Sequence, residues 1–349
     1  MLRTVRKFLF TLLTLIIAFI TVSLLYGDSQ KPERPITAER FSISAKRLPL
    51  PAGNADIATS LSLRLTDVWD LNSASRTFGG LSALHASGSS LTFMADNSAM
   101  IRVMQDGQSR RWTGIVSPLP AACRAVGQKE RRDTESMISD RATGTLWIGF
   151  EVRNGVCRIA SAERGGSRYY NPDSMEKWPQ TGGAEAMVRL AKGGFLIFAE
   201  RPRGNGPVAD VVHFDRDPVD PAALVTVMTY RPPSGYRPVD AVELPDGRIL
   251  VLNRRFQLPF SFSARLSIID ARRVAAGLVL TGPVIARLDG DDLGENFEAL
   301  ALDNDGENLT IWVASDDNFM SYQRTVLLRF IWPGAGRLAA GLEGRAKPR

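Results

Sequence analysis

Acidic side chains recur at matching places along this 349-residue chain. Five segments share one pattern: a small or acidic opening residue, an apolar stretch, a turn with glycine, and a second apolar stretch that ends in a polar residue. Each segment predicts a two-stranded antiparallel hairpin, whose first and last residues lie at the same end. The pattern therefore predicts one pair of polar residues per hairpin: Ser82 with Asp96, Glu135 with Glu151, Glu185 with Glu200, Asp240 with Asn253, and Glu298 with Asp316.

These pairs are candidates for a metal site, because crowded carboxylates repel one another unless cations, arginines or backbone donors compensate their charge. Calcium suits such a set, since it accepts about six to eight oxygen ligands with loose geometry. The alternative that the acids only bind loop backbone between neighbouring repeats stays open. The calcium ligands that we expect are Glu135, Glu151, Glu185, Glu200, Asp240, Glu298 and Asp316.

The opening acids of four hairpins are the catalytic candidates of this site: Glu135, Glu185, Asp240 and Glu298. Basic residues beside the same motifs could neutralise the acids or bind phosphate oxygens. These substrate-binding candidates are Lys129, Arg132, Arg254, Arg255 and Arg324, and further oxygen donors beside them are Asp133, Asp317 and Asn318.

Other hydrolytic motifs are missing from the sequence. There is no G-x-S-x-G, and His85 and His213 are the only histidines, which argues against a serine triad. The H-E-x-x-H zinc motif and the P-loop are also absent. Residues 303–306 resemble part of an EF-hand loop, but alanine and tryptophan stand where its first and last acidic ligands belong. We interpret this stretch as a hairpin turn.

The elements that would position these acids are the blades of a β-propeller. The opening residues are spaced by 53, 50, 55 and 58 residues, which suits four-stranded blades around a central channel. The opening strands would line the channel and bring the polar pairs to one rim. We predict an all-β propeller of five or six blades over residues 61–332, with an open β-sandwich as the alternative. Residues 41–71 hold a sixth blade, or else a strand at 62–71 closes the ring by joining the last blade.

The N-terminal segment predicts export. Residues 8–25 form an uncharged apolar stretch of 18 residues that follows Arg3, Arg6 and Lys7. The lack of a convincing small-x-small cleavage site favours an uncleaved anchor over a removed signal peptide. The folded part would lie on the periplasmic side of the bacterial inner membrane, or be secreted to the periplasm. We expect a signal peptide or membrane anchor with a hydrophobic helix at 1–27, a linker and lead-in at 28–60, and a flexible tail at 333–349.

The charge balance argues against a nucleic acid partner. The formal net charge is +6, and without the three basic residues that precede the apolar stretch it is about +3. We expect a monomer whose membrane contact is the N-terminal segment.

Cys123 and Cys157 are the only cysteines, and both follow the export segment. An oxidising compartment permits a disulfide between them, although two separate buried thiols are an alternative. Two thiols alone cannot complete a four-ligand zinc site.

Several motifs in order resemble the esterase-like-activity-of-phytase family, also called phytase-like proteins. The resemblance covers roughly residues 60–332 and implies a propeller-type domain of exported bacterial proteins with a link to phytate and phosphoester hydrolysis. Two departures are Cys157, where the family more often has an aromatic residue, and NFEAL in place of a glycine-containing NFEGL. The motifs are FGGLSAL (78–84), RDTESM (132–137), WIGFE (147–151), GGAEAM (182–187), GYRPVDAVELPDGRILVLNRRF (235–256), NFEAL (296–300) and SDDNF (315–319).

Three functions fit these features. The first is a calcium-dependent hydrolase of a phosphorylated or ester small molecule. The second is a non-catalytic propeller that binds a ligand or an envelope partner at the same rim, and the third is a lactonase-like hydrolase with one calcium in the channel. The fold cannot choose among them, because function resides in the site.

Overall fold

A computed structural model describes residues 6–7, 11–14, 16, 36–51, 62–106, 110–123, 133–140, 142–201, 206–258 and 261–335. Most of the expected N-terminal segment and most of the expected tail lie outside these residues. Within the described ranges, no helix is both long enough and apolar enough to cross a membrane.

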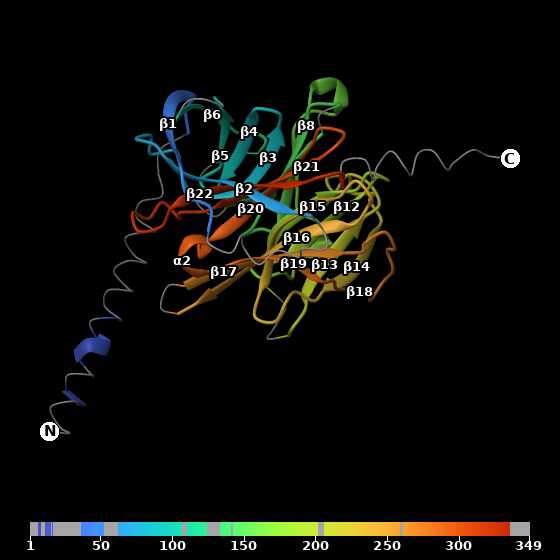
Figure 1. Ribbon diagram of the computed structural model, residues 1–349. Coiled ribbons are helices and arrows are strands. Elements are labelled where there is room, and N and C mark those ends of the chain that lie inside the picture. Colours follow the sequence, from blue (N-terminus) through green and yellow to red (C-terminus); the bar gives the residue numbers. More distant parts are fainter. Residues whose placement is uncertain are drawn as a thin grey trace.

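The described chain is almost entirely β-structure (Figure 1). Residues 6–7, 11–14 and 16 are helical, and the other helical elements are short: η3 (Ala162–Arg164), η4 (Asp173–Met175) and α2 (Gly290–Leu293). The largest sheet contains, in spatial order, β20 (Phe297–Asn304), β21 (Leu309–Ser315), β22 (Thr325–Trp332), β2 (Arg64–Asn72), β1 (Glu39–Arg47), β6 (Arg111–Pro118), β5 (Ala99–Met104), β4 (Ser90–Ala95) and β3 (Leu81–Ser87).

Three smaller sheets complete the domain. The first contains β10 (Arg168–Tyr170), β9 (Gly155–Ile159), β8 (Thr145–Phe150) and β7 (Thr134–Asp140). The second contains β11 (Ala184–Arg189), β12 (Phe195–Ala199), β13 (Ala209–Phe214), β14 (Val225–Tyr230) and β18 (Val279–Leu280). The third contains β15 (Arg237–Glu243), β16 (Ile249–Gln257), β17 (Ser261–Ile269) and β19 (Val284–Leu288).

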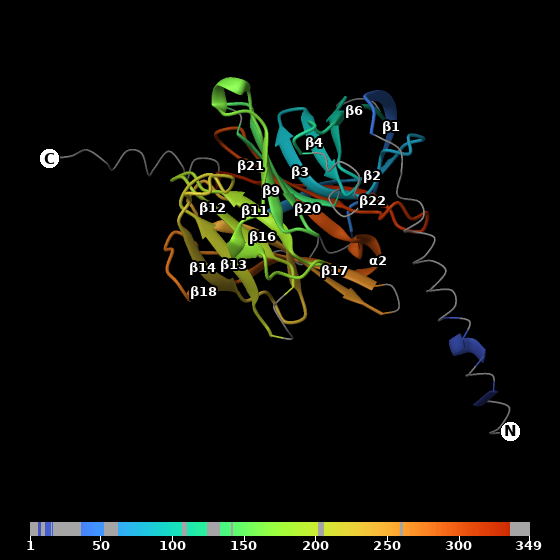
Figure 2. The same ribbon diagram turned by 180° about the vertical axis from the view of Figure 1, so that it is seen from behind.

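The first strands of the five repeated hairpins form a ring. Strands β3, β7, β11, β15 and β20 contact one another in this order, and β20 contacts β3 again. Figure 2 shows the sheets from behind, grouped around this centre. The all-β, propeller-like architecture is thereby confirmed, and the open β-sandwich is excluded because its first strands would not meet in a closed circle.

Strands β1 and β2 close the ring at its outer side. Strand β2 pairs with β22, the third strand of the last hairpin group, and β1 pairs with both β2 and β6. The segment 62–71 thus joins the last group, which is one of the two predicted alternatives. This pairing also explains why one sheet is so large: β1 and β2 connect the last group to the first and leave fewer free strand edges.

Apolar side chains fill the spaces between neighbouring sheets. Leu252 of β16 and Leu266 of β17 lie in one cluster with Val313 of β21. In another cluster, Phe198 of β12 lies with Val251 of β16. Burial of each such side chain contributes about 1.5–3 kcal/mol. Each sheet therefore depends on both neighbours, which keeps the ends of the inner strands in fixed relative positions.

The predicted disulfide is present between Cys123 and Cys157, whose Cα atoms are 5.6 Å apart. Cys157 belongs to β9 in the second hairpin group, whereas Cys123 follows β6 of the first. The bridge therefore ties two neighbouring groups together. It lies in a cluster that also contains Ala83 of β3 and Ile148 of β8.

Candidate functional site

Each strand of the inner ring contains a β-bulge near its beginning. A bulge leaves one residue unpaired in the ladder and redirects its side chain. Four of the five bulged residues are polar, and three are glutamates. The bulges lie at Ser82, Glu135, Glu185, Val239 and Glu298.

A second column of side chains lies beside the bulges, at the end of each returning strand. The backbone N–H groups of Asp96, Glu151, Glu200 and Asp316 each donate to the residue just before the inner strand or at its edge. Arg254 takes the equivalent position in the fourth hairpin, where it pairs with Arg237. This column therefore contains four acids and one arginine.

The predicted pair of the fourth hairpin is wrong by one residue on both strands. Its register pairs Pro238 with Asn253 and places the bulge at Val239, so Asp240 and Asn253 stand one position inside the two columns. In the other four hairpins, a small residue such as Ala186 occupies the position of Asp240. The fourth hairpin thus contributes no acid to either column.

Asp240 instead binds backbone. Its carboxylate accepts hydrogen bonds from the N–H of Leu300 on β20, at 2.6 Å, and from the N–H of Ala241, at 2.8 Å. Burial raises the pKa of Asp240 well above its usual range, and the two backbone hydrogen bonds oppose that rise. Asp240 therefore connects two inner strands, which is the structural role that the sequence left open for these acids.

Replacing Asp240 with alanine should lower the free energy of unfolding by about 1–3 kcal/mol, because the buried N–H of Leu300 loses its acceptor. Any rise in melting temperature on adding calcium should remain. Urea unfolding measures the loss of stability, and melting curves with and without calcium measure the response to the metal. If the variant has normal stability but its melting temperature no longer rises with calcium, Asp240 is a metal ligand after all.

Carboxylates from different hairpins lie close enough to repel one another. The pKa of Glu185 is raised well above its usual range, first by burial and then by Glu200, Glu151 and Glu298. Burial also raises the pKa of Glu135, and Glu185 is the strongest of the acids that raise it further. The ring therefore gathers acids of the second, third and fifth hairpins into one polar cluster.

Asp316 extends this cluster toward the first hairpin. Its pKa is raised by burial and then by the carboxylates of Asp96 and Glu298. Asp316 also accepts hydrogen bonds from the N–H of Asn318, at 2.6 Å, and from the Asn296 amide, at 3.4 Å. Part of its charge is thus compensated by the surrounding loop.

Three acids of the second hairpin form the tightest group. Oxygen atoms of Asp133, Glu135 and Glu151 all lie within 4.8 Å of one another. Asp133 precedes β7, the bulge redirects Glu135, and Glu151 ends the returning strand. Three converging carboxylates are ligands of the kind that calcium prefers. Glu135 and Glu151 are predicted ligands, and Asp133 is one of the additional donors noted in the sequence.

Glu151 titrates near neutrality. Burial raises its pKa to about 7, although hydrogen bonds from the Gly182 N–H and with Glu185 lower it. Repulsion by Asp133 adds to the rise. Above pH 7 this group therefore has a negative charge that its hydrogen bonds only partly compensate.

The metal-free protein should lose stability as the pH rises from about 5 to 8. The pKa of Glu151 is higher in the folded state than in the unfolded chain, so the folded state holds the proton more tightly and stability falls as pH passes its folded pKa of about 7. His213, whose pKa burial lowers, acts in the opposite sense. Melting temperatures in EDTA for the protein and for Glu151→Gln should diverge, with the variant falling less. Parallel pH profiles would contradict this assignment.

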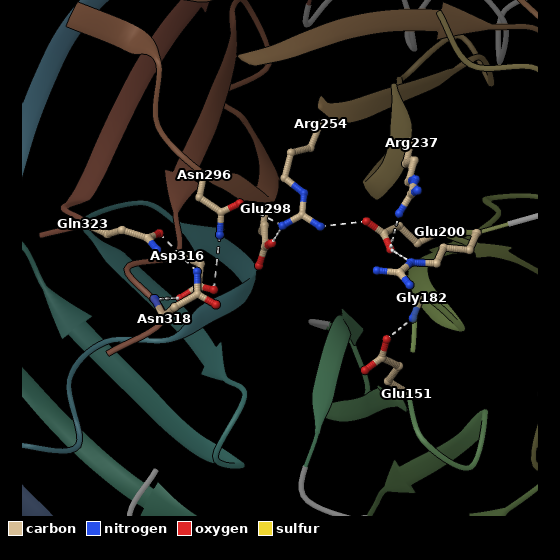
Figure 3. Close-up of polar contacts among 11 residues, drawn as sticks. Glu151, Gly182, Glu200, Arg237, Arg254, Asn296, Glu298, Asp316, Asn318 and Gln323 are labelled. Carbon is tan, nitrogen blue, oxygen red and sulfur yellow. Dashed lines mark hydrogen bonds and ion pairs between the residues drawn. The ribbon is translucent and has the colours of Figure 1, made fainter. Parts of the chain in front are cut away.

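Arg254 stands between two of the acids (Figure 3). Its Nη2 donates to Glu200 at 2.7 Å, and its Nη1 donates to Glu298 and, at 2.8 Å, to Asn296. Burial alone would lower the pKa of Arg254, but Glu298 and Glu200 raise it above its usual range. Arg254 thus joins the third and fifth hairpins through charge-assisted hydrogen bonds.

Glu200 has two further cationic partners that sequence reasoning missed. Its Oε2 lies 3.4 Å from Nε of Arg201 and 3.8 Å from Nη1 of Arg237. Only the three-dimensional approach of the third and fourth hairpins brings Arg237 to this acid, so no local motif could have indicated it. The cluster therefore has an acidic side around Glu135 and a basic side around Glu200.

The other predicted basic residues do not gather at one place beside the acidic cluster. Arg255 lies over the Tyr236 ring, 4.7 Å from its centroid, and lines a cavity of about 600 Å³ beside Arg254. Arg324 donates to Glu295 at 2.9 Å from Nε, and this ion pair occupies it. Lys129 and Arg132 lie outside the described residues.

Asp317 and Asn318, which the sequence indicated as further oxygen donors, form hydrogen bonds within and around the loop that follows β21. The Asp317 carboxylate accepts hydrogen bonds from the N–H of Gly80, just before β3, and from the hydroxyl of Thr325. Asn318 donates to Gln323 at 3.1 Å. Asp317 thereby ties the last hairpin to the first, which keeps both ends of the ring together.

Comparison with known proteins agrees with the sequence motifs. Residues 76–319 match the model of the family described as phytase-like, esterase-like activity of phytase. No curated protein matches the chain.

Solved structures that align with the chain are distant. YCF48 bound to a D1 peptide is 10% identical, with a TM-score of 0.35 over 85% of this chain and 95% of that one. The β-propeller domain of Cps50 (Swd1) from Myceliophteria thermophila is 9% identical, with a TM-score of 0.39 over 82% of this chain and 99% of that one. A protein from Lactobacillus plantarum is 12% identical, with a TM-score of 0.35 over 83% and 81%. These similarities are too weak to indicate a function.

Proposed function

We propose that this chain, which belongs to the phytase-like family, is an exported phosphoester hydrolase that holds calcium at the acidic rim of its β-propeller. The observation that supports this most directly is the group formed by Asp133, Glu135 and Glu151, whose oxygens lie within 4.8 Å of one another. It is the kind of cluster that a hard divalent cation would stabilise, because burial, and then repulsion by neighbouring acids, raises the pKa values of Glu135 and Glu151.

The donor set fits calcium. Three carboxylates can supply several oxygens, and water would complete the coordination. Bound calcium would polarise a phosphate oxygen and lower the pKa of a bound water. Asp133, Glu135 and Glu151 would hold the ion.

Other polar residues of the rim and of the adjoining cavity would have roles that follow from their charge. Glu185, whose pKa is raised by burial and then by the neighbouring acids, would be the proton donor to the leaving oxygen. Glu298 accepts a hydrogen bond from Arg254 and orients that guanidinium. Arg255, on the cavity, would bind the phosphate of the substrate through charge-assisted hydrogen bonds. Asp240 has no part in the chemistry, because backbone groups occupy its carboxylate.

The finer architecture and location belong to the same proposal. We count five blades, one for each inner strand, with β2 as the outer strand of the last. The apolar stretch at 8–25 would place the domain on the periplasmic side of the inner membrane, as a monomer. The disulfide between Cys123 and Cys157 is consistent with that oxidising compartment.

A non-catalytic binding propeller is the second candidate. Several rim acids already have structural partners, since Arg254 neutralises Glu200 and Glu298, and Asn296 and Asn318 bind Asp316. Such a rim could recognise a ligand without any reaction.

Metal analysis and activity assays of the purified protein separate the two candidates. We expect bound calcium, a rise in melting temperature on adding calcium, and hydrolysis of a phosphomonoester or of phytate that EDTA stops and calcium restores. Binding at 100 times Kd would stabilise the fold by about 2.7 kcal/mol. Calcium stabilisation without hydrolysis of phosphoesters or lactones would favour the binding propeller. If calcium neither binds nor changes the melting temperature or the activity, the proposed calcium site is wrong.

A further inference from the structure

The cavity beside Arg254 has two chemically different walls. It encloses about 600 Å³ and meets the acidic cluster through Glu200 and Arg254. Arginines 201, 237 and 255 line it as well. Its apolar wall is formed by Phe256, Phe262, Met320 and Tyr322.

The apolar wall comes from segments that extend past the ring. The last residue of β16 that pairs with β15 is Arg254, whereas β16 and β17 continue to pair through Phe256 and Phe262. The two rings lie 5.0 Å apart between centroids. Tyr322 belongs to the loop between β21 and β22, so the fourth and fifth hairpin groups both contribute to this wall.

These aromatic side chains are unusually accessible. Phe256 is 48% exposed and Tyr322 is 54% exposed, although most large apolar residues of the domain are buried. Apolar surface that lines a concave site beside polar groups is typical of ligand-binding pockets. The wall therefore offers contact area to an apolar group of a ligand.

The polar wall contains a cation without an anionic partner. Among the described residues, Arg254, Arg237 and Arg201 all contact Glu200, whereas the guanidinium of Arg255 has no ion pair or hydrogen bond. Arg255 packs on the Tyr236 ring, and its Nε is buried without a hydrogen-bond acceptor.

The second arginine on that ring provides the comparison. Arg265 lies 4.9 Å from the same centroid but donates to Asp289 at 2.8 Å. Arg255 is thus the basic side chain of this cavity that an external anion can neutralise.

We propose that this cavity selects an organic phosphate with an aromatic or similarly flat apolar group, whose anion binds Arg255 while its apolar part packs on Phe256, Phe262 and Tyr322. This rests on the proposed function and narrows its substrate class, because a uniformly polar polyphosphate would leave the apolar wall in water.

Equilibrium binding tests this without turnover. Calorimetry of the full chain would compare 1-naphthylphosphonate, methylphosphonate and the neutral 1-naphthalenemethanol. We expect naphthylphosphonate to bind about tenfold or more tightly than either, because only it uses both walls. Equal affinity of the two phosphonates would overturn the role of the apolar wall, and equal affinity of the phosphonate and the alcohol would overturn that of Arg255.

Three variants locate the site. Phe256→Ser and Tyr322→Ser should weaken naphthylphosphonate at least about fivefold and leave methylphosphonate unchanged, whereas Arg255→Gln should weaken both phosphonates about tenfold. Leu224→Ser is the matched control, since Leu224 is 69% exposed and is not part of this cavity. Melting curves would verify folding. Unchanged naphthylphosphonate affinity in the aromatic variants would refute the proposal.

Hydrolysis distinguishes this inference from the proposed function. If naphthylphosphonate binds as described but neither 1-naphthyl phosphate nor glycerol 2-phosphate is hydrolysed with calcium present, the ligand class stands and the hydrolase fails. If glycerol 2-phosphate and 1-naphthyl phosphate are hydrolysed with the same kcat/KM, the hydrolase stands and the ligand class fails.

Discussion

Replacing Arg254 with methionine should lower the free energy of unfolding by about 3–5 kcal/mol at pH 8. The guanidinium bridges Glu200 and Glu298, whose side chains are only 4% and 14% exposed. Glu200 would keep Arg201 and Arg237, but Glu298 would lose the cation that faces it. A carboxylate left in this position without compensation is costly, and the neighbouring acids would repel it further. Urea unfolding measures the loss.

Two companion variants identify the cause. Adding Glu298→Gln to Arg254→Met should recover part of the stability, because the uncompensated charge is then removed. Arg254→Lys keeps the positive charge but should be only partly more stable than Arg254→Met. One ammonium group cannot reach both acids in the way a guanidinium does. Arg272→Met, which breaks an exposed pair with Asp270, should leave stability nearly unchanged. An Arg254→Met protein as stable as the parent would show that the bridge has no structural role.

The repeat pattern predicted the fold because it is local. The apolar stretches and the turn of each segment predict a hairpin, and the repetition of the same unit predicts a ring. The strand at 62–71 could be assigned to ring closure as one of two alternatives for the same reason. Its actual partner, β22, lies more than 200 residues away in the sequence, so the pairing itself could not be read from local pattern.

The fourth hairpin shows where local pattern misleads. Asp240, followed by alanine and valine, imitates Glu185 and the residues that follow it, yet the bulge places Val239 at the position of Glu185. A signal was available, since the interval from Val239 to Arg254 equals that from Glu185 to Glu200. A one-residue shift in a strand moves a side chain to the other face, which is why Asp240 meets the N–H of Leu300 and misses the acidic cluster.

Arg254 illustrates a different limit. The sequence indicated a basic residue beside the acids, but its function as a bridge depends on the hairpins at both sides. Glu200 and Glu298 are 54 and 44 residues away from it, and only closure of the ring brings both within hydrogen-bonding distance. Contacts of this kind depend on the packing between sheets, so residue types alone cannot reveal them.

Neutralising the tightest acidic group should abolish the response to calcium. In Glu135→Gln/Glu151→Gln, two of the three carboxylates that lie within 4.8 Å of one another become amides, and Asp133 alone would bind calcium weakly. We expect the calcium-dependent rise in melting temperature to disappear. Phosphoester hydrolysis should fall at least about 100-fold, since metal stabilisation of the transition state is worth several kcal/mol and each 1.4 kcal/mol is a factor of ten.

The same double variant should not unfold, and this makes the experiment decisive. Burial and mutual repulsion raise the pKa values of Glu135 and Glu151, so uncharged side chains should stabilise the metal-free protein at pH 8. Lost activity together with an equal or higher melting temperature in EDTA would therefore point to the metal site. Asp140→Asn is the matched control, because it removes one charge from the opposite end of β7, where Asp140 pairs with Arg189. A double variant that still hydrolyses phosphoesters in response to calcium would place the metal elsewhere on the rim, with Glu185, Glu200, Glu298 and Asp316 as the remaining acids to test.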